Sequence, residues 1–392
     1  MNSLYLHIPF CERKCVYCSF YSIESFANQA RFMEAIVREI DGDIEEPGRG
    51  AAGEPIGTIF FGGGTPSVLS PEEIGRIMTA LRNRYAIADD AEITMECNPG
   101  ALNRDWLEGY RAAGVNRLSF GVQSFHDDDL QFLSRIHTAA EAERNIRLVR
   151  QVFDNVSLDL IFALPGQTLD RWRSNLERAI DLGTDHISAY ALIFEEGTPL
   201  NAMRLKGRVR PATNDQEADM YEATMATLGD AGFMQYETSN YARPGRACRH
   251  NIGYWERGGY DGFGPSAHSF RRRGVLGERR ANVSSLNAYL DAVESGSSPV
   301  IMREQVTPEL ATEEIVMLGL RYRGIDRSEF RAAAGADVSV IATGIVEKMV
   351  AGAYATLDPE RLSLTPKGTI FADRFALEII DAVERSGQLS PQ

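Results

Sequence analysis

The amino-acid sequence predicts an α/β protein, with an open, partial (β/α)6 barrel followed by a small helical, winged-helix-like C-terminal domain. Six short apolar runs each precede a helix-like segment in the region 1–232. Six such units in series are typical of a parallel sheet with right-handed crossovers, and they are too few to close an eight-fold barrel. From Thr307 onward the pattern changes to helices, with a short hairpin at Tyr354–Leu364 and another helix from Pro366.

The elements of the barrel follow from apolar periodicity and from helix start and stop signals. The expected strands are Leu4–Ile8, Thr58–Phe61, Glu92–Glu96, Arg117–Phe120, Ser157–Ile161 and His186–Leu192. The expected helices are Ala27–Asp41, Pro71–Tyr85, Arg104–Ala113, Ala139–Phe153, Leu169–Leu182 and Asn214–Ala231. Ser70 followed by Pro71 is typical of a helix start, and Gly114 falls where a helix C-cap belongs. The stretch 42–57, rich in Gly, Pro and Glu, is expected to form a surface loop.

The composition excludes several classes of protein. A net charge of −14 argues against general binding of nucleic acid, which needs a basic surface. No run approaches the ~18 apolar residues of a membrane-spanning helix, and no signal-peptide pattern opens the chain. We therefore expect a cytoplasmic protein whose contact with a membrane, if any, is peripheral.

A cluster of cysteines directly follows the first expected strand, as a C-x3-C-x2-C run formed by Cys11, Cys15 and Cys18. Thiolates select zinc, Cu(I) or iron–sulfur clusters, and clusters are normally held by four cysteines. With three local cysteines, one iron of a 4Fe–4S cluster remains open to another ligand. The alternative is a zinc site completed by His7, Cys97 or Cys248, but zinc sites usually pair their ligands and no second pair exists here. The run therefore predicts an iron–sulfur site.

Further unusual residues lie at or after the ends of the other expected strands, where active sites of such folds collect. The Gly62–Gly64 run either lets a ligand approach the backbone or forms a tight turn. Glu96 can bind hydroxyl or amino groups, or be a surface acid. Arg135 suits a carboxylate, or is an ordinary surface charge. Asp159 sits in an apolar strand, where a carboxylate is costly without a partner, and this favours a functional role.

Four motifs together resemble the oxygen-independent coproporphyrinogen III oxidase family of radical S-adenosylmethionine (SAM) proteins. They are Tyr-x-His-Ile-Pro-Phe-Cys, Gly-Gly-Gly-Thr-Pro, Gly-Val-Gln-Ser-Phe and Asp-Leu-Ile-x-x-Leu-Pro-Gly, and the resemblance covers essentially the whole chain. It implies a radical SAM barrel in which Cys11, Cys15 and Cys18 bind a 4Fe–4S cluster and the open iron binds SAM. The SAM site that it implies is lined by Tyr5, Tyr17, Gly62, Gly63, Thr65, Glu96, Gln123, Arg135, Asp159 and Ala191.

The chain departs from the true oxidase in ways that put decarboxylase activity in doubt. The oxidase motif continues Cys-x-Cys after the third ligand, whereas this chain has Cys18-Ser19-Phe20, and the long N-terminal extension of the oxidase is missing. Instead, the segment 250–255 resembles the H-N-x-x-Y-W motif of the family's haem-chaperone branch. This implies a haem-binding protein that delivers haem to acceptor haemoproteins.

The resemblance makes His250 the first candidate for an axial haem ligand, with Cys248 second and His268 third. A packed core histidine is the alternative for His250. Five arginines in the segment 271–280 can meet porphyrin propionates or form a solvated loop. The enzyme alternative is oxidative decarboxylation of coproporphyrinogen III propionates to vinyl groups with SAM, and a third alternative is a radical SAM enzyme with another substrate.

The expected organisation has three regions. Residues 1–232 form the barrel with the 4Fe–4S and SAM site. Residues 233–300 form a haem- or substrate-associated region, and residues 301–392 form the C-terminal domain.

Overall fold

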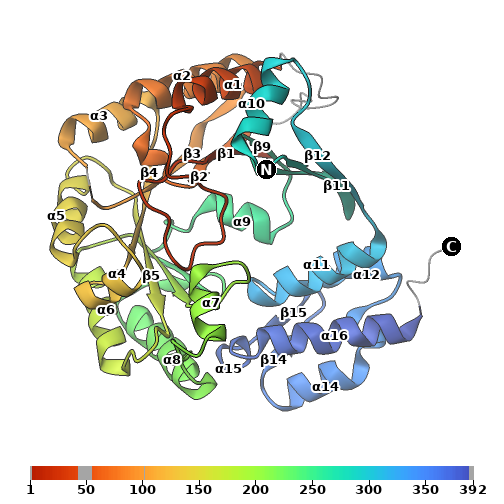
Figure 1. The fold of residues 1–392 in the computed structure, drawn as a ribbon. Helices are drawn as coiled ribbons and strands as arrows, with labels where there is room; N and C mark the ends of the chain where they lie inside the picture. Colours follow the sequence, from red (N-terminus) through yellow and green to blue (C-terminus); the bar gives the residue numbers. More distant parts are fainter. Residues whose placement is uncertain (1, 43–54, 101, 388–392) are drawn as a thin grey trace.

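The computed structural model describes residues 2–42, 55–100 and 102–387, and it is built around one curved sheet (Figure 1). The parallel centre of the sheet contains β1 (Asn2–Ile8), β2 (Ile56–Gly63), β3 (Ile87–Cys97), β4 (Arg117–Gln123), β5 (Val156–Phe162) and β6 (His186–Ala191). Its outer face is covered by α1 (Gln29–Asp41), α2 (Pro71–Arg84), α3 (Arg104–Ala113), α5 (Ala139–Val149), α6 (Leu169–Asp181) and α8 (Asn214–Asp230). The six expected strand–helix units are therefore confirmed.

The helix boundaries follow from local chemistry. Ser70 and Glu73 form a reciprocal capping box at the start of α2, behind Pro71. Gly114 ends α3 in the left-handed conformation, with φ of 111°. Three short helices that the sequence pattern did not indicate lie in the connections, namely η1 (Pro66–Val68), α4 (Asp127–Phe132) and α7 (Pro199–Leu205). Most of the surface loop expected at 42–57 lies outside the described residues.

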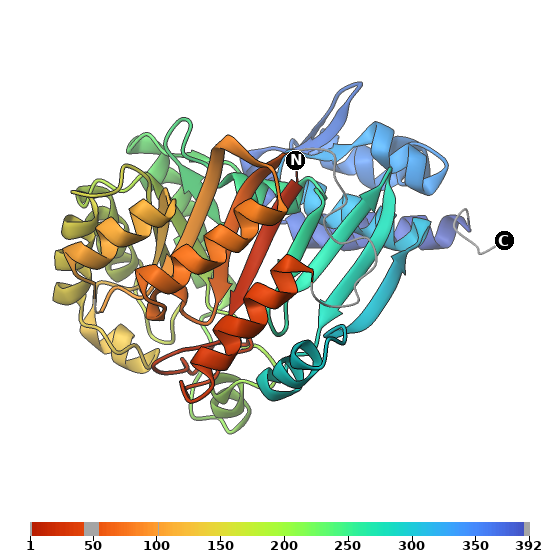
Figure 2. The same ribbon diagram turned by 90° about the horizontal axis from the view of Figure 1, so that it is seen from above.

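The segment 234–306 extends both edges of the same sheet. It contributes β7 (Met234–Gln235), β8 (Asn240–Ala242), β9 (Tyr260–Phe263), β10 (His268–Arg273), β11 (Leu276–Asn282) and β12 (Val300–Val306). In the resulting 12-stranded sheet, β8 and β7 follow β6 on one side, while β9 to β12 follow β1 on the other. Figure 2 shows β10 to β12 continuing the sheet beyond β1. Sequence periodicity gave no signal for these strands. The strands β7, β8 and β9 have only 2, 3 and 4 residues, and β10 to β12 carry runs of charged residues instead of an apolar alternation.

Two helices of this segment have different surroundings. The first, α9 (Arg249–Trp255), lies inside the curve of the sheet against β2, on the side opposite to the outer helices (Figure 1). The second, α10 (Leu286–Glu294), packs against α1. Because α9 fills the inside of the barrel, the segment that carries the H-N-x-x-Y-W motif is part of the interior of the protein.

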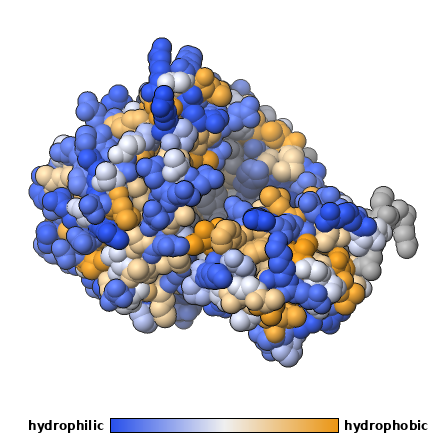
Figure 3. All heavy atoms as spheres, turned by 90° about the horizontal axis from the view of Figure 1, so that it is seen from below, coloured by the Kyte–Doolittle hydropathy of each residue, from blue (hydrophilic) through white to orange (hydrophobic). Residues whose placement is uncertain are grey.

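The C-terminal part has a core of its own and a small antiparallel sheet with strand order β13-β15-β14. Its elements are α11 (Pro308–Arg321), β13 (Ile325–Asp326), α12 (Arg327–Ala334), α13 (Val338–Ile341), α14 (Thr343–Ala351), β14 (Ala355–Leu357), β15 (Arg361–Leu364), α15 (Pro366–Thr369) and α16 (Ala372–Ser386). The expected hairpin is present, and β13 adds a third strand too short to be recognised in the sequence. The molecule is hollowed between the barrel, at the left of the space-filling view, and this C-terminal part at the right (Figure 3).

The two ends of the large sheet, β7 and β12, are not paired with each other, so the barrel is open as expected. Within the described ranges, no helix is both long and apolar enough to cross a membrane.

Candidate functional site

A pocket of about 460 Å³ opens at the carboxyl ends of the parallel strands. We call it the cluster pocket. It brings together most of the residues singled out in the sequence: Cys11, Cys15, Tyr17, Cys18, Gly63, Thr65, Glu96, Gln123, Arg135, Asp159 and Ala191. Tyr5 and Gly62 lie next to it, since a Cβ placed on Gly62 would be 3.1 Å from the Tyr5 ring and 3.2 Å from the Glu96 carboxylate. His250 is not among the residues of this pocket.

The three loop cysteines are free thiols held by backbone and side-chain contacts. The Cys11 amide donates to the Ile23 carbonyl at 2.9 Å, and the Cys18 amide donates to the Cys15 carbonyl at 3.2 Å. Thr65 Oγ1 donates to Cys11 Sγ at 3.4 Å, and Arg135 Nη1 donates to Cys15 Sγ at 3.3 Å. Donors directed at two of the sulfurs suit thiolate ligands.

The donor set fits a cluster better than a single metal ion. In the part of the chain that the structure describes, no three His, Cys, Asp or Glu side chains converge closely enough to hold one ion. His7, proposed as a zinc ligand, is bound instead by the Tyr5 hydroxyl at 3.1 Å and the Tyr21 carbonyl at 2.9 Å. Cys248 lies beside Glu92, at 3.5 Å. A 4Fe–4S cluster can span sulfurs that one zinc ion cannot, and when bound it would supply an iron that is open to a further ligand.

The Gly62–Gly64 run is required by the packing of the protein itself. Gly63 has φ of 106°, and a Cβ there would be 2.6 Å from the His7 ring. A Cβ on Gly64 would be 2.6 Å from the Phe10 carbonyl oxygen. The tight-turn alternative therefore explains these two glycines without a ligand, and their contact with SAM stays a prediction.

Charged groups of both signs face the cluster pocket. Burial, together with the neighbouring Asp159 charge, raises the pKa of Glu96 to about 8. Burial also raises the pKa of Asp159 to about 6, although the Ser119 hydroxyl, at 3.4 Å, and the hydroxyl of Ser188 oppose this effect. A bound cation would favour the ionised form of both carboxyls.

Arg135 lies in the loop between α4 and α5, directed at the same pocket. Its Nη2 donates to the Gly121 carbonyl at 2.6 Å and to Asn98 Oδ1 at 3.3 Å, while its buried Nε has no hydrogen-bond partner among the described residues. One guanidinium and two carboxyls in one pocket are complementary to the carboxylate and ammonium of an amino acid.

Two exposed apolar side chains lie at the cluster pocket, among charged ones. Phe20 is 67% exposed and Ile193 is 64% exposed, and both line the pocket. Phe20 occupies the position where the oxidase motif has a cysteine.

His250 lies near the amino ends of the strands, an end of the barrel that we call the floor. Its ring is 1% exposed and stacks on Phe60, with 5.0 Å between ring centroids. Nδ1 is 2.8 Å from Thr58 Oγ1, whose hydroxyl donates to Ser3 Oγ at 2.9 Å. Nε2 is 2.9 Å from the Tyr254 hydroxyl. In this conformation His250 is a packed, hydrogen-bonded histidine, and iron can reach it only if Tyr254 moves.

The protonation of His250 follows from these contacts. Burial lowers the pKa of His250 to about 3, so the ring is neutral. With the Thr58 hydroxyl donating to Ser3, we assign the proton of the ring to Nδ1, which leaves a lone pair on Nε2.

Sequence reasoning missed two strand residues, Glu92 on β3 and Arg117 on β4, that hold helix α9 in place. Glu92 accepts a hydrogen bond from the His250 amide at 3.2 Å and faces Arg117 at 3.8 Å. These two side chains are only 7% and 1% exposed. Glu92 and Glu96 share one face of β3, because side chains alternate along a strand. The spacing of four residues between Glu92 and Glu96 was the signal in the sequence, because it places Glu92 on the same face of the strand as the predicted site residue Glu96.

Comparison with known proteins agrees with the fold. Residues 5–179 match the Radical SAM superfamily, and residues 306–371 match the HemN C-terminal domain. The fold, the cysteine loop and these two matches define a radical SAM protein, a class whose cofactors are a 4Fe–4S cluster and SAM.

Several relatives named heme chaperone HemW match most of the chain. The protein from Bacillus subtilis is 34% identical over 378 residues, covering 95% of this chain and 97% of its own. The one from Escherichia coli is 40% identical over 271 residues, covering 68% of this chain and 69% of its own. The chain therefore belongs to the heme chaperone HemW family.

A solved structure shares the whole architecture. Coproporphyrinogen III oxidase (HemN) from Escherichia coli superposes with a TM-score of 0.80 at 23% identity, covering 96% of this chain and 89% of that one. At this identity the likeness shows the fold alone.

Proposed function

We propose that this protein is a haem-binding chaperone that passes haem to acceptor haemoproteins. The observation that carries the proposal is the state of His250 in α9: a neutral ring whose Nε2 lone pair is bound by a single hydroxyl. Neutral imidazole is a common axial ligand of haem iron. The family of relatives named heme chaperone, with its H-N-x-x-Y-W motif, supports the same function.

In this proposal different regions of the chain bind the cofactors and the haem. Cys11, Cys15 and Cys18 hold the 4Fe–4S cluster, and the residues around the cluster pocket bind SAM. We assign both cofactors a role in assembly or gating rather than in turnover. The region 233–300 contains the haem ligand, and the residues 301–392 form the C-terminal domain. We expect the protein to act in the cytoplasm, with at most peripheral contact with a membrane.

The ligand assignment can be tested by haem titration of anaerobically reconstituted protein. We expect the wild type to bind haem with a distinct Soret band, and His250→Ala to shift or abolish that band because the axial nitrogen is removed. Cys248→Ser and His268→Ala are the matched controls. A loss of the band in either of them, with none in His250→Ala, would move the ligand to that residue.

The same preparation tests the enzyme alternative. Incubation with coproporphyrinogen III, SAM and a reductant should yield no decarboxylated product, because Phe20 stands where the oxidase has a cysteine. Formation of vinyl groups from propionates would establish the oxidase activity and overturn the chaperone proposal as the main function.

A further inference from the structure

Another pocket lies between the barrel and the C-terminal part of the molecule, and it shares no residue with the cluster pocket. It has a volume of about 260 Å³. The barrel side of its wall contains the end of α9, the turn after it, and Arg272 of β10. The opposite side comes from α11, the turn that follows it, β13, α12 and β15. We call it the junction pocket.

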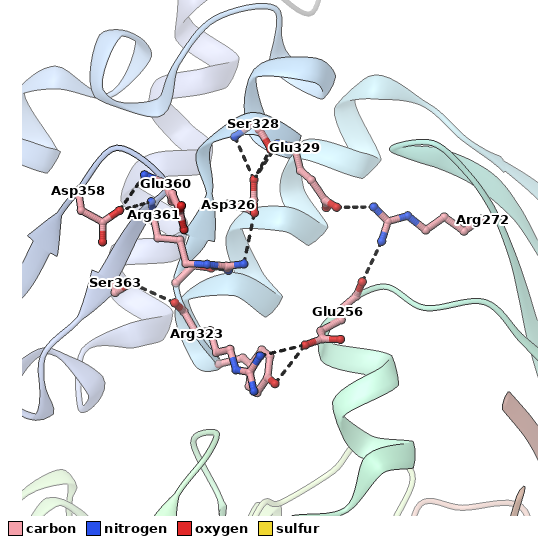
Figure 4. A network of polar contacts seen from close by, with 12 residues as sticks. Glu256, Arg272, Arg323, Asp326, Ser328, Glu329, Asp358, Glu360, Arg361 and Ser363 are labelled. Carbon is pink, nitrogen blue, oxygen red and sulfur yellow. Dashed lines mark hydrogen bonds and ion pairs between the residues drawn. The ribbon is translucent and has the colours of Figure 1, made fainter. Parts of the chain in front are cut away.

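The acidic side chains of the junction pocket are already compensated by cations. Each of the three carboxylates has an arginine partner, in the pairs Glu329–Arg272, Asp326–Arg361 and Glu256–Arg323. Figure 4 shows these pairs around the pocket, with Arg272 also donating to the Glu256 carbonyl at 2.9 Å. Glu256 accepts a further hydrogen bond from the Tyr322 hydroxyl at 3.2 Å. An anion in the pocket would therefore meet carboxylates whose charge is balanced by their neighbours.

Arg257, in the turn after α9, differs from these paired side chains. It lines the pocket, and its side chain is only 4% exposed. Its Nε donates to Glu314 Oε2 at 2.9 Å, and its Nη2 lies at the same distance from that oxygen. Its Nη1 is buried and has no hydrogen-bond partner among the described residues. Because an unpaired buried donor on a charged group is costly, a ligand that accepts this hydrogen bond would stabilise the protein.

The charges around Arg257 favour an anion as that ligand. Arg279 of β11 pairs with the same Glu314 carboxylate, so two guanidinium groups share it. Arg279 has a second partner in Glu304, at 2.7 Å, whereas Arg257 pairs with Glu314 alone among the described residues. Burial, and to a smaller extent the charges of Arg272 and Arg279, lower the pKa of Arg257 to about 10. The group therefore stays cationic at neutral pH, in surroundings that compensate its charge incompletely.

The backbone of Arg257 is unusual as well. Its φ of 52° lies in the left-handed region, which residues with a side chain rarely adopt. The turn is held by the Arg257 amide, which donates to the Tyr254 carbonyl at 3.0 Å, and by Arg272, which binds the Glu256 carbonyl. Strained positions that the surrounding packing maintains cluster at ligand sites.

We propose that the junction pocket binds a small oxyanion, a phosphate or a carboxylate, with Arg257 as its buried cationic contact. A guanidinium forms strong, charge-assisted hydrogen bonds with the oxygens of both groups. The pocket is slightly smaller than the roughly 300–1,000 Å³ of typical ligand pockets, so the ligand is a small one. Since its wall comes from both parts of the molecule, the anion would hold the C-terminal part against the barrel. This site goes beyond the proposed haem function and does not depend on it.

Thermal unfolding of the full, reconstituted protein can detect the anion, because a ligand that binds only the folded state raises Tm. Inorganic phosphate or succinate should raise the Tm of the wild type above its value in chloride at equal ionic strength, and calorimetry then gives the affinity. Arg257→Lys keeps a positive charge beside Glu314 but removes Nη1, and it should weaken binding at least tenfold. Arg173→Lys makes the same exchange at an exposed arginine of α6 and should leave the affinity unchanged.

A second pair of variants changes the volume of the pocket and not its charge. Leu318, on α11, lines the pocket and is partly exposed. Leu318→Trp should abolish anion binding by filling the space, whereas Leu318→Met conserves the volume and should bind as the wild type does. These two variants decide the question if Arg257→Lys fails to fold. His250→Ala should keep the affinity for the anion, so the haem function and this site can fail separately.

The two probes identify the class of ligand. A response to phosphate alone supports a site for phosphate groups, and a response to succinate alone supports a site for carboxylates. If neither probe binds at millimolar concentration, the junction pocket is no anion site and the inference is wrong. The same holds if a probe binds Arg257→Lys and Leu318→Trp as tightly as it binds the wild type, because the anion then lies elsewhere on the protein.

Discussion

Polar side chains face the inside of the barrel at both of its ends, but the two ends differ in the partners that these side chains have. At the cluster end, the buried Nε of Arg135 has no partner among the described residues, and Glu96 and Asp159 share a pocket with raised pKa values. At the floor, both ring nitrogens of His250 are hydrogen-bonded. The same is true of His186, whose ring lies 2.6 Å from Ser157 Oγ and 2.8 Å from the Tyr236 hydroxyl.

The difference shows how each end can accept a ligand. At the cluster end, the Arg135 Nε has no partner among the described residues, so a ligand can gain that contact without breaking another. At the floor, both ring nitrogens of His250 are already hydrogen-bonded, so a ligand of this ring must displace a protein contact before it forms its own. We therefore expect substitutions at the floor to lower mainly the free energy of unfolding, and substitutions at the cluster end to lower mainly the affinity for a ligand.

The largest effect is expected for the buried pair at the floor. Glu92→Ala leaves the Arg117 guanidinium without its carboxylate and frees the His250 amide, and it should cost roughly 3 kcal/mol of unfolding free energy. Urea unfolding measures the loss. Glu108→Ala removes an exposed carboxylate paired with Arg104 and should cost less than about 1 kcal/mol. Equal losses in both variants would mean that the buried pair at the floor contributes no more to stability than an exposed ion pair does.

A smaller effect is expected at the cluster end. Arg135→Ala removes the guanidinium that faces the pocket and should weaken SAM binding by about 2 kcal/mol, or roughly 30-fold, as for a lost charged hydrogen bond. Calorimetry on reconstituted protein measures the affinity, and iron analysis checks that the cluster is retained. Arg144→Ala, on the exposed side of α5, is the control. Unchanged affinity in Arg135→Ala would contradict the assignment of the cluster pocket to SAM.

The smallest effect is a dependence of SAM binding on pH. In the ligand-free protein the Glu96 carboxyl, with a pKa of about 8, is mostly protonated at neutral pH. A bound ammonium group favours the carboxylate, so binding releases a proton and affinity should rise as pH increases from 6 to 8. The increase cannot exceed about tenfold per pH unit for one group. Glu96→Gln should remove it, and a wild-type affinity independent of pH would exclude Glu96 as a partner of the ammonium.

Much of the cluster end was predictable from the sequence, because its features are local. Three cysteines within eight residues are close in any fold, and a strand followed by a capped helix can be recognised in a short window. The parallel sheet then places the strand ends on one face, which brings Thr65, Gln123 and Asp159 to the cysteine loop. The family resemblance named the same residues.

The floor was decided by tertiary structure. His250 and Thr58 are 192 positions apart, and no local pattern pairs them. The sequences of β7 to β12 show no regular alternation of apolar and polar residues, so their place at both edges of the sheet follows from pairing with β6 and β1 rather than from their own sequence. A histidine beside two aromatic residues is compatible with a buried core position or with a haem ligand. The contact between Tyr254 and Nε2 is local, because the two residues lie four positions apart in one helix. The contacts that bury the ring, with Thr58 and Phe60 of β2, come from the packing of α9 inside the barrel, and only the tertiary structure decides them.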